Sequence, residues 1–78
     1  MMTLAESLDK ANRDFDAIAE RILRDCELMY VDMGADPDEL AAGLARERAT
    51  LADGRRQLLS MVRTAFAVGF DAPSARVH

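Results

Sequence analysis

The polar side chains that could carry chemistry are few, and the most suggestive are Glu47, Arg48 and Arg55. At helical spacing, Glu47 falls in the middle of an apolar arc, and the two arginines flank that arc. One hypothesis is therefore a small dimeric helical enzyme whose shared cavity holds this polar group. The simpler interpretation is that Glu47 reaches solvent or pairs with an arginine, because a lone buried carboxylate is costly. The sequence offers no partner base, so we expect no catalytic residues and no enzyme.

Metal and cofactor chemistry find little support in the sequence. Four acidic residues crowd the middle of the chain, namely Asp32, Asp36, Asp38 and Glu39. Their spacing does not match a calcium loop, and acids at the start of a helix explain them better. Cys26 has no nearby histidine, and the chain has no glycine-rich phosphate loop. We expect neither a metal nor a cofactor.

Charge is distributed unevenly along the 78 residues, whose formal net charge is −4. Residues 1–39 hold eleven acidic and four basic side chains, whereas residues 40–78 hold three and six. The two halves would attract each other when folded side by side. A second hypothesis gives the acids a function, as an acidic face that mimics nucleic acid and blocks a basic groove. That face would comprise Asp9, Asp14, Asp16, Glu20, Asp25, Glu27 and Asp32.

Small phage-borne inhibitors, including some anti-CRISPR proteins, act by such mimicry. Basic residues on the same stretch dilute the acids, so this hypothesis ranks second. Direct nucleic-acid binding is not expected from an acidic chain whose few clustered arginines lack interleaved aromatics. No apolar run is long enough to cross a membrane, and the N-terminus does not resemble a signal peptide. With one cysteine, the composition favours a cytoplasmic protein.

Two long helices must position these residues. The spacing predicts a first helix over about 4–33, begun by the capping-box residues Thr3 and Glu6. Its first six apolar positions, from Leu4 to Ile22, alternate steps of four and three, as in a coiled-coil seam, and the step from Ile22 to Cys26 breaks this alternation. Gly34 predicts the end of this helix, and residues 34–36 form an elbow. Pro37 then begins a second helix over about 37–69, and residues 71–78 form a flexible tail.

Gly54 is the one residue that could interrupt the second helix. An interior glycine costs about 1 kcal/mol relative to alanine, so a kink or break here is the alternative to one continuous helix. With the joint near residue 35, an antiparallel hairpin sets residue i opposite about residue 70 − i. Gly54 then lies across from Phe15, and close packing against that ring favours the continuous helix.

The fold class predicted for residues 1–78 is a single all-α domain, an antiparallel two-helix hairpin. Such a hairpin has a thin core, so we expect a homodimer that forms a four-helix bundle, or an obligate partner of another kind. The apolar end of the second helix leaves surface to cover. The expected interface comprises Leu4, Leu8, Leu58, Leu59, Met61, Val62, Phe66 and Phe70. The leading hypothesis is a non-enzymatic protein–protein interaction module, such as a small adaptor, assembly factor or inhibitor.

Overall fold

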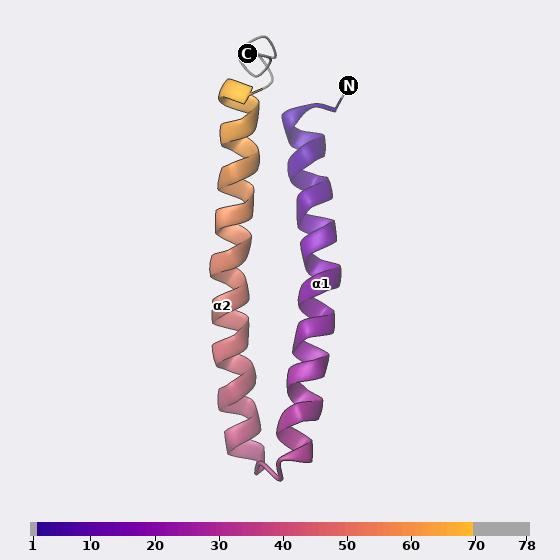
Figure 1. The fold of residues 1–78 in the computed structure, drawn as a ribbon, viewed down its shortest axis with the longest axis vertical. Helices are drawn as coiled ribbons and strands as arrows, with labels where there is room; N and C mark the ends of the chain where they lie inside the picture. The colour runs from indigo at the N-terminus through magenta and orange to yellow at the C-terminus, as the bar shows by residue number, and fades with distance from the viewer. Residues whose placement is uncertain (1, 70–78) are drawn as a thin grey trace, which may run out of the picture.

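Two long helices lie side by side and run in opposite directions in the computed structural model, which describes residues 2–69 (Figure 1). Helix α1 spans Leu4–Asp32 and helix α2 spans Pro37–Thr64. The last described residues, Ala65–Gly69, form a π-helical turn, η1, so the second helix stops being α-helical about one turn earlier than its pattern predicts. The prediction of an all-α chain with two helices is confirmed over these residues. Phe70 and the predicted tail lie outside the described residues.

Each helix begins with a complete capping box. At the start of α1, the Glu6 N–H donates to Thr3 Oγ1 at 3.1 Å, and the Thr3 N–H donates to Glu6 Oε1 at 2.8 Å. Asp36 and Glu39 repeat this exchange at the start of α2, with distances of 2.8 and 2.9 Å. These bonds satisfy backbone groups that have no partner within the helix. The Thr3 backbone N–H, followed by its hydroxyl, also lowers the pKa of the Glu6 carboxyl below its ordinary value.

The elbow is a Schellman motif built on Gly34. This glycine has a φ of +78°, in the left-handed region where a side chain would be strained. The Gly34 N–H donates to the Val31 carbonyl and the Ala35 N–H donates to the Tyr30 carbonyl, both at 3.0 Å. Four residues therefore reverse the chain, and the short connection sets how α1 and α2 lie against each other.

Helix α2 runs without a break through Gly54. A Cβ placed on this glycine would lie 3.6 Å from Phe15 Cζ and 3.7 Å from Cε2, which confirms the predicted opposition of the two residues. These distances are ordinary van der Waals contacts, however, and not clashes. Phe15 therefore leaves room for a methyl group, and packing does not require glycine at this position.

We expect Gly54→Ala to stabilise the protein by about 1 kcal/mol, because alanine favours a helix and the new methyl group would touch Phe15. The free energy of unfolding in urea, measured at fixed protein concentration, tests this value. A loss of stability would show that α2 needs to bend at this residue.

The core of this hairpin is thin. Among residues 2–68, only Ala19 and Gly43 are buried, and no large side chain is fully enclosed. The molecule measures 56 × 23 × 16 Å, with a Cα radius of gyration of 17.7 Å. A compact chain of this length would have a radius of about 11–12 Å. One copy of the chain therefore leaves much of its apolar surface in water.

Candidate functional site

Arg55 is the main polar link between the two helices. Its Nη1 donates to Asn12 Oδ1 at 2.9 Å, and its Nη2 forms an ion pair with Asp16. Its guanidinium carbon also lies 4.9 Å from the centre of the Phe15 ring, a cation–π distance. The Arg55 side chain is about one-third exposed, so these contacts are less screened than those of a surface pair. Arg55 therefore holds α2 against α1 and is not a free ligand-binding group.

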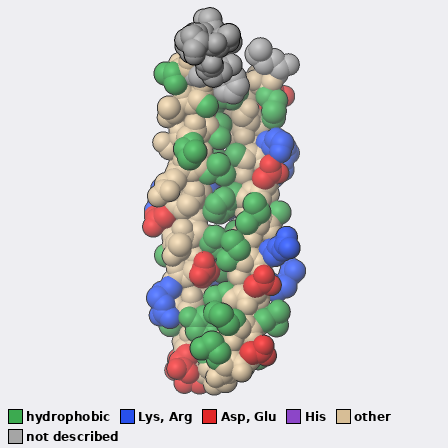
Figure 2. All heavy atoms as spheres, viewed as in Figure 1, with side chains coloured by type: hydrophobic (Ala, Val, Ile, Leu, Met, Phe, Trp, Pro, Cys, Tyr) green, Lys and Arg blue, Asp and Glu red, His purple; other side chains and the backbone are tan. Residues whose placement is uncertain are grey.

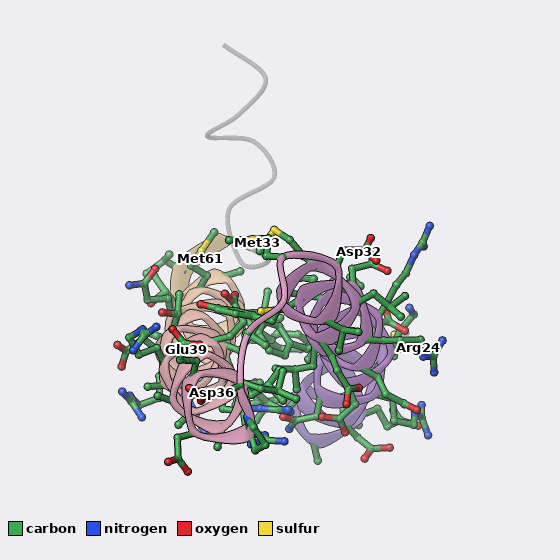
Figure 3. The ribbon with its side chains drawn as sticks, turned by 90° about the horizontal axis from the view of Figure 1, so that it is seen from below. Arg24, Asp32, Met33, Asp36, Glu39 and Met61 are labelled. Carbon is green, nitrogen blue, oxygen red and sulfur yellow. The ribbon has the colours of Figure 1, made fainter. Side chains whose placement is uncertain are left out.

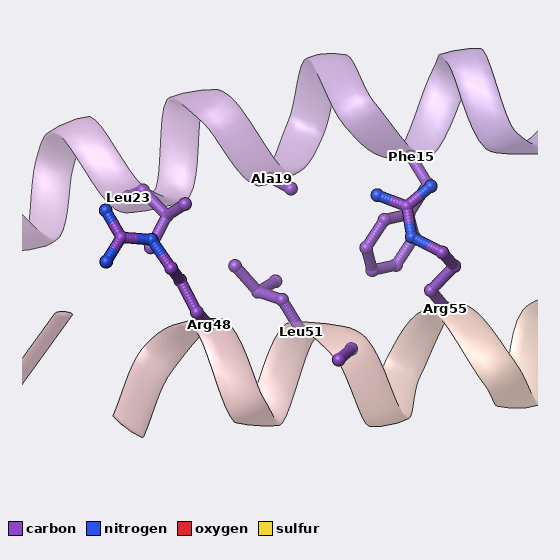
Figure 4. A pocket seen from close by; sticks show the side chains of 7 residues that line it. Phe15, Ala19, Leu23, Arg48, Leu51 and Arg55 are labelled. Carbon is purple, nitrogen blue, oxygen red and sulfur yellow. The ribbon is translucent and has the colours of Figure 1, made fainter. Parts of the chain in front are cut away.

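Arg55 borders a shallow cavity of about 170 Å³ between the helices (Figure 4). Its lining is apolar apart from two arginines and comprises Phe15, Ala19, Leu23, Arg48, Leu51, Ala52 and Arg55. Glu47 is half-buried, does not line the cavity and forms no ion pair within the described chain. The structure thus brings Arg48 and Arg55 to one cavity and leaves Glu47 outside its lining.

A larger feature is an apolar surface along one side of the hairpin. Figure 2 shows hydrophobic side chains gathered along the junction of the two helices. Ten large hydrophobic residues are exposed in the described chain, and six of them belong to this surface. We call it the open face, and it comprises Leu4, Ile18, Ile22, Met29, Met33 and Met61.

Helical geometry explains why the open face exists. At 100° per residue, its four α1 residues and the C-cap residue Met33 fall within an arc of about 60°. The α1 residues that pack against α2, including Phe15, Ala19 and Tyr30, are centred about 70° away. One neighbouring helix cannot cover both arcs, so the outer one stays in water. Figure 3 shows Met33, the C-cap residue of α1, and Met61 of α2 on the same side of the hairpin, which places both on this face.

The interface residues predicted from sequence are divided by the structure. Leu8, Leu58, Leu59, Val62 and Phe66 are half-buried, whereas Leu4 and Met61 are exposed and belong to the open face. Phe70 lies outside the described residues. The open face extends from the end of the hairpin that holds Leu4 and Met61 to the elbow, where Met33 is 72% exposed. From the first helix, the sequence-based interface included only Leu4 and Leu8, so it missed Ile18, Ile22, Met29 and Met33; the width of the apolar stripe on this helix was the available signal.

The seven predicted acidic residues are separated into two rows. Asp9, Asp16, Glu20 and Glu27 fall within about 40° of one another around α1, and Asp14, Asp25 and Asp32 lie roughly 150° away. Four of the seven form ion pairs: Asp9 with Arg13, Asp14 with Lys10, Glu20 with Arg24, and Asp16 with Arg55. Helix α1 therefore does not present a single continuous acidic face.

Within residues 2–69, no three His, Cys, Asp or Glu side chains lie close enough together to hold a metal ion. Over the same residues, neither helix has the length and apolar character needed to cross a bilayer. Cys26 is half-buried and forms no disulfide.

The fold and its surface define a class: a small all-α helical hairpin with an open apolar face. Comparison with known protein families, with curated proteins and with solved structures finds no match for the chain. What the protein does must therefore be inferred from its own residues.

Proposed function

We propose that the protein is a non-enzymatic protein–protein interaction module, an adaptor, assembly factor or inhibitor that acts through its open face. The observation that carries this proposal is the exposure of Ile18, Met29 and Met33 in one line along a well-formed helix. Contiguous exposed apolar surface of this kind is typical of sites that bind another protein. An α-helical partner is the natural occupant, because the line of side chains follows a helix axis.

The partner that accounts best for the thin core is a second copy of the chain, completing a four-helix bundle. The chain exposes 5968 Å², whereas a folded monomer of 8.6 kDa exposes about 4,700 Å². The surplus of about 1,300 Å² exceeds the roughly 800 Å² that each partner buries in a standard interface. The surface available for burial is therefore large enough for a stable homodimer.

Two serine substitutions on α1 test the proposal. Ile18 on the open face is 57% exposed, and Val31 on another side of the helix is 58% exposed. Both are β-branched apolar residues, so Ile18→Ser and Val31→Ser change helix propensity and exposed area alike. We expect Ile18→Ser to abolish or greatly weaken dimerisation and Val31→Ser to leave it unchanged.

The measurement is solution mass by light scattering across a dilution series, with helicity followed by circular dichroism. Equal effects of the two variants would contradict a role for the open face. A wild-type chain that is monomeric at every concentration would overturn the homodimer, and the open face would then be tested against partners of another kind.

A further inference from the structure

The residues of the open face also indicate how two copies would be arranged. This inference rests on the proposed function and goes beyond it. A twofold interface uses the same patch on both subunits, so the patch must be complementary to itself. Two arrangements bring the open faces together. In one, α1 packs on the partner's α2 and the elbows meet at one end; in the other, α1 packs antiparallel on the partner's α1 and the elbows lie at opposite ends.

The side chains facing each other argue against the first arrangement. There, the level of Ile18 and Ile22 would be occupied by residues near 52 and 48 of the partner's α2, following the register of the hairpin. The flank of α2 at that level carries polar side chains, namely Glu47, Thr50 and Asp53. The apolar side chains of Ile18 and Ile22 would thus face polar ones, and among these Glu47 has no ion pair in the described chain, so burying it is costly.

Charge at the elbow also argues against the first arrangement. The elbow region carries Asp32, Asp36, Asp38 and Glu39, and no basic residue lies between Arg24 and Arg46. The first arrangement would gather eight such carboxylates at one end of the dimer. The second separates the two elbows by the length of the bundle, well beyond the screening distance of about 8 Å at physiological salt.

In the second arrangement, the open-face residues of α1 pack against the open-face residues of the partner's α1. If residue i lies opposite about residue 40 − i of the partner, Ile18 meets the partner's Ile22, and Ala11 meets the partner's Met29. Ala11 is half-buried and falls on the same arc as the open face, so a small residue faces a long one. Two hairpins in this register also overlap over nearly their whole length. We infer that the protein is an antiparallel dimer in which the α1 helices of two copies pack together in this register, with the elbows at opposite ends.

The same register pairs charges on the flank of the interface. Asp32, which has no ion pair in the described part of the chain, lies opposite residue 8 of the partner and so within one turn of the partner's Lys10, which also pairs with Asp14 of its own helix. Asp25 comes to the level of the partner's Asp14, a like charge. Each pairing occurs twice by symmetry. The two carboxylates therefore have opposite expected effects on association, although each contributes the same formal charge.

Two isosteric substitutions use this difference. Asp32→Asn is expected to raise the dissociation constant of the dimer about threefold, and Asp25→Asn to lower it about threefold, since exposed charge pairs have modest energies. Both variants reduce the net charge equally, so a general loss of repulsion would tighten both dimers. Tightening of both would overturn the register, as would no change in either.

Disulfide cross-linking tests the arrangement directly. Ala11→Cys and Met29→Cys are each made in a Cys26→Ser background, mixed and oxidised. We expect a covalent dimer joining the two variants and little cross-linking of either variant alone, because residue 11 of one copy lies about 27 Å along the axis from residue 11 of the other. A dimer by light scattering without this mixed cross-link overturns the arrangement but leaves the proposed function standing. A monomer at every concentration overturns the second copy as the occupant of the open face.

Discussion

Gly43→Ala should destabilise the hairpin by about 1–3 kcal/mol, even though alanine favours a helix more than glycine does. Gly43 is one of the two buried residues in the described chain, and the Tyr30 ring lies directly on it. A Cβ at this position would fall 2.3 Å from Tyr30 Cζ and 2.6 Å from its hydroxyl oxygen. The ring would have to leave the interface between the helices, with loss of its burial and of the hydrogen bond that Arg46 donates to it at 3.4 Å. Urea unfolding at fixed protein concentration measures the loss.

A double-mutant cycle with Tyr30→Ala identifies the cause. In the Tyr30→Ala background the clash is gone, so Gly43→Ala should stabilise the protein by about 1 kcal/mol, and the sign of the effect should reverse. Gly54→Ala is the matched control, because it makes the same change on the same face of α2, about three turns away, without a clash. If Gly43→Ala stabilises the wild-type chain, the tyrosine ring moves aside at no cost and our account of this contact is wrong.

Arg55→Ala is expected to cost about 2 kcal/mol of stability. The substitution removes the charge-assisted hydrogen bond to Asn12, the ion pair with Asp16 and the packing on the Phe15 ring. A hydrogen bond to a charged group contributes about 1.5–3 kcal/mol and a cation–π contact about 0.5–1 kcal/mol at a partly exposed site. The higher helix propensity of alanine offsets little of this loss of stability. Thermal or urea unfolding measures the effect.

The neighbouring arginine provides the control for this prediction. Arg56 is 71% exposed and, within the described residues, pairs only with Asp53 on its own helix, so Arg56→Ala should change stability by less than about 0.5 kcal/mol. Arg55→Lys keeps the charge but loses the planar group that lies on Phe15 and bonds two residues, so it should lose at least half of the stabilisation. Equal effects of Arg55→Ala and Arg56→Ala would show that the contacts across the helices contribute nothing.

Much of this fold is determined locally and could be read from the sequence. Thr3 with Glu6, and Asp36 with Glu39, begin helices because their side chains satisfy backbone groups three residues away. Gly34 ends α1 because its backbone adopts a left-handed conformation that other residues avoid. The elbow is short, so the position of these stop and start signals also sets the register. This is why the contact between Gly54 and Phe15 could be predicted before the structure was known.

The tertiary structure decided which parts of the apolar stripe are covered. Periodicity places apolar residues on one side of α1, but only the position of α2 shows that Phe15 and Tyr30 are packed while Ile18 and Met29 are not. It also revealed that Gly43 is needed by a ring from another helix, whereas Gly54 has room for a methyl group. Helix ends depend on neighbours along the chain, and a short sequence window contains them. Coverage depends on the direction from which a second helix approaches, and no local pattern contains that direction.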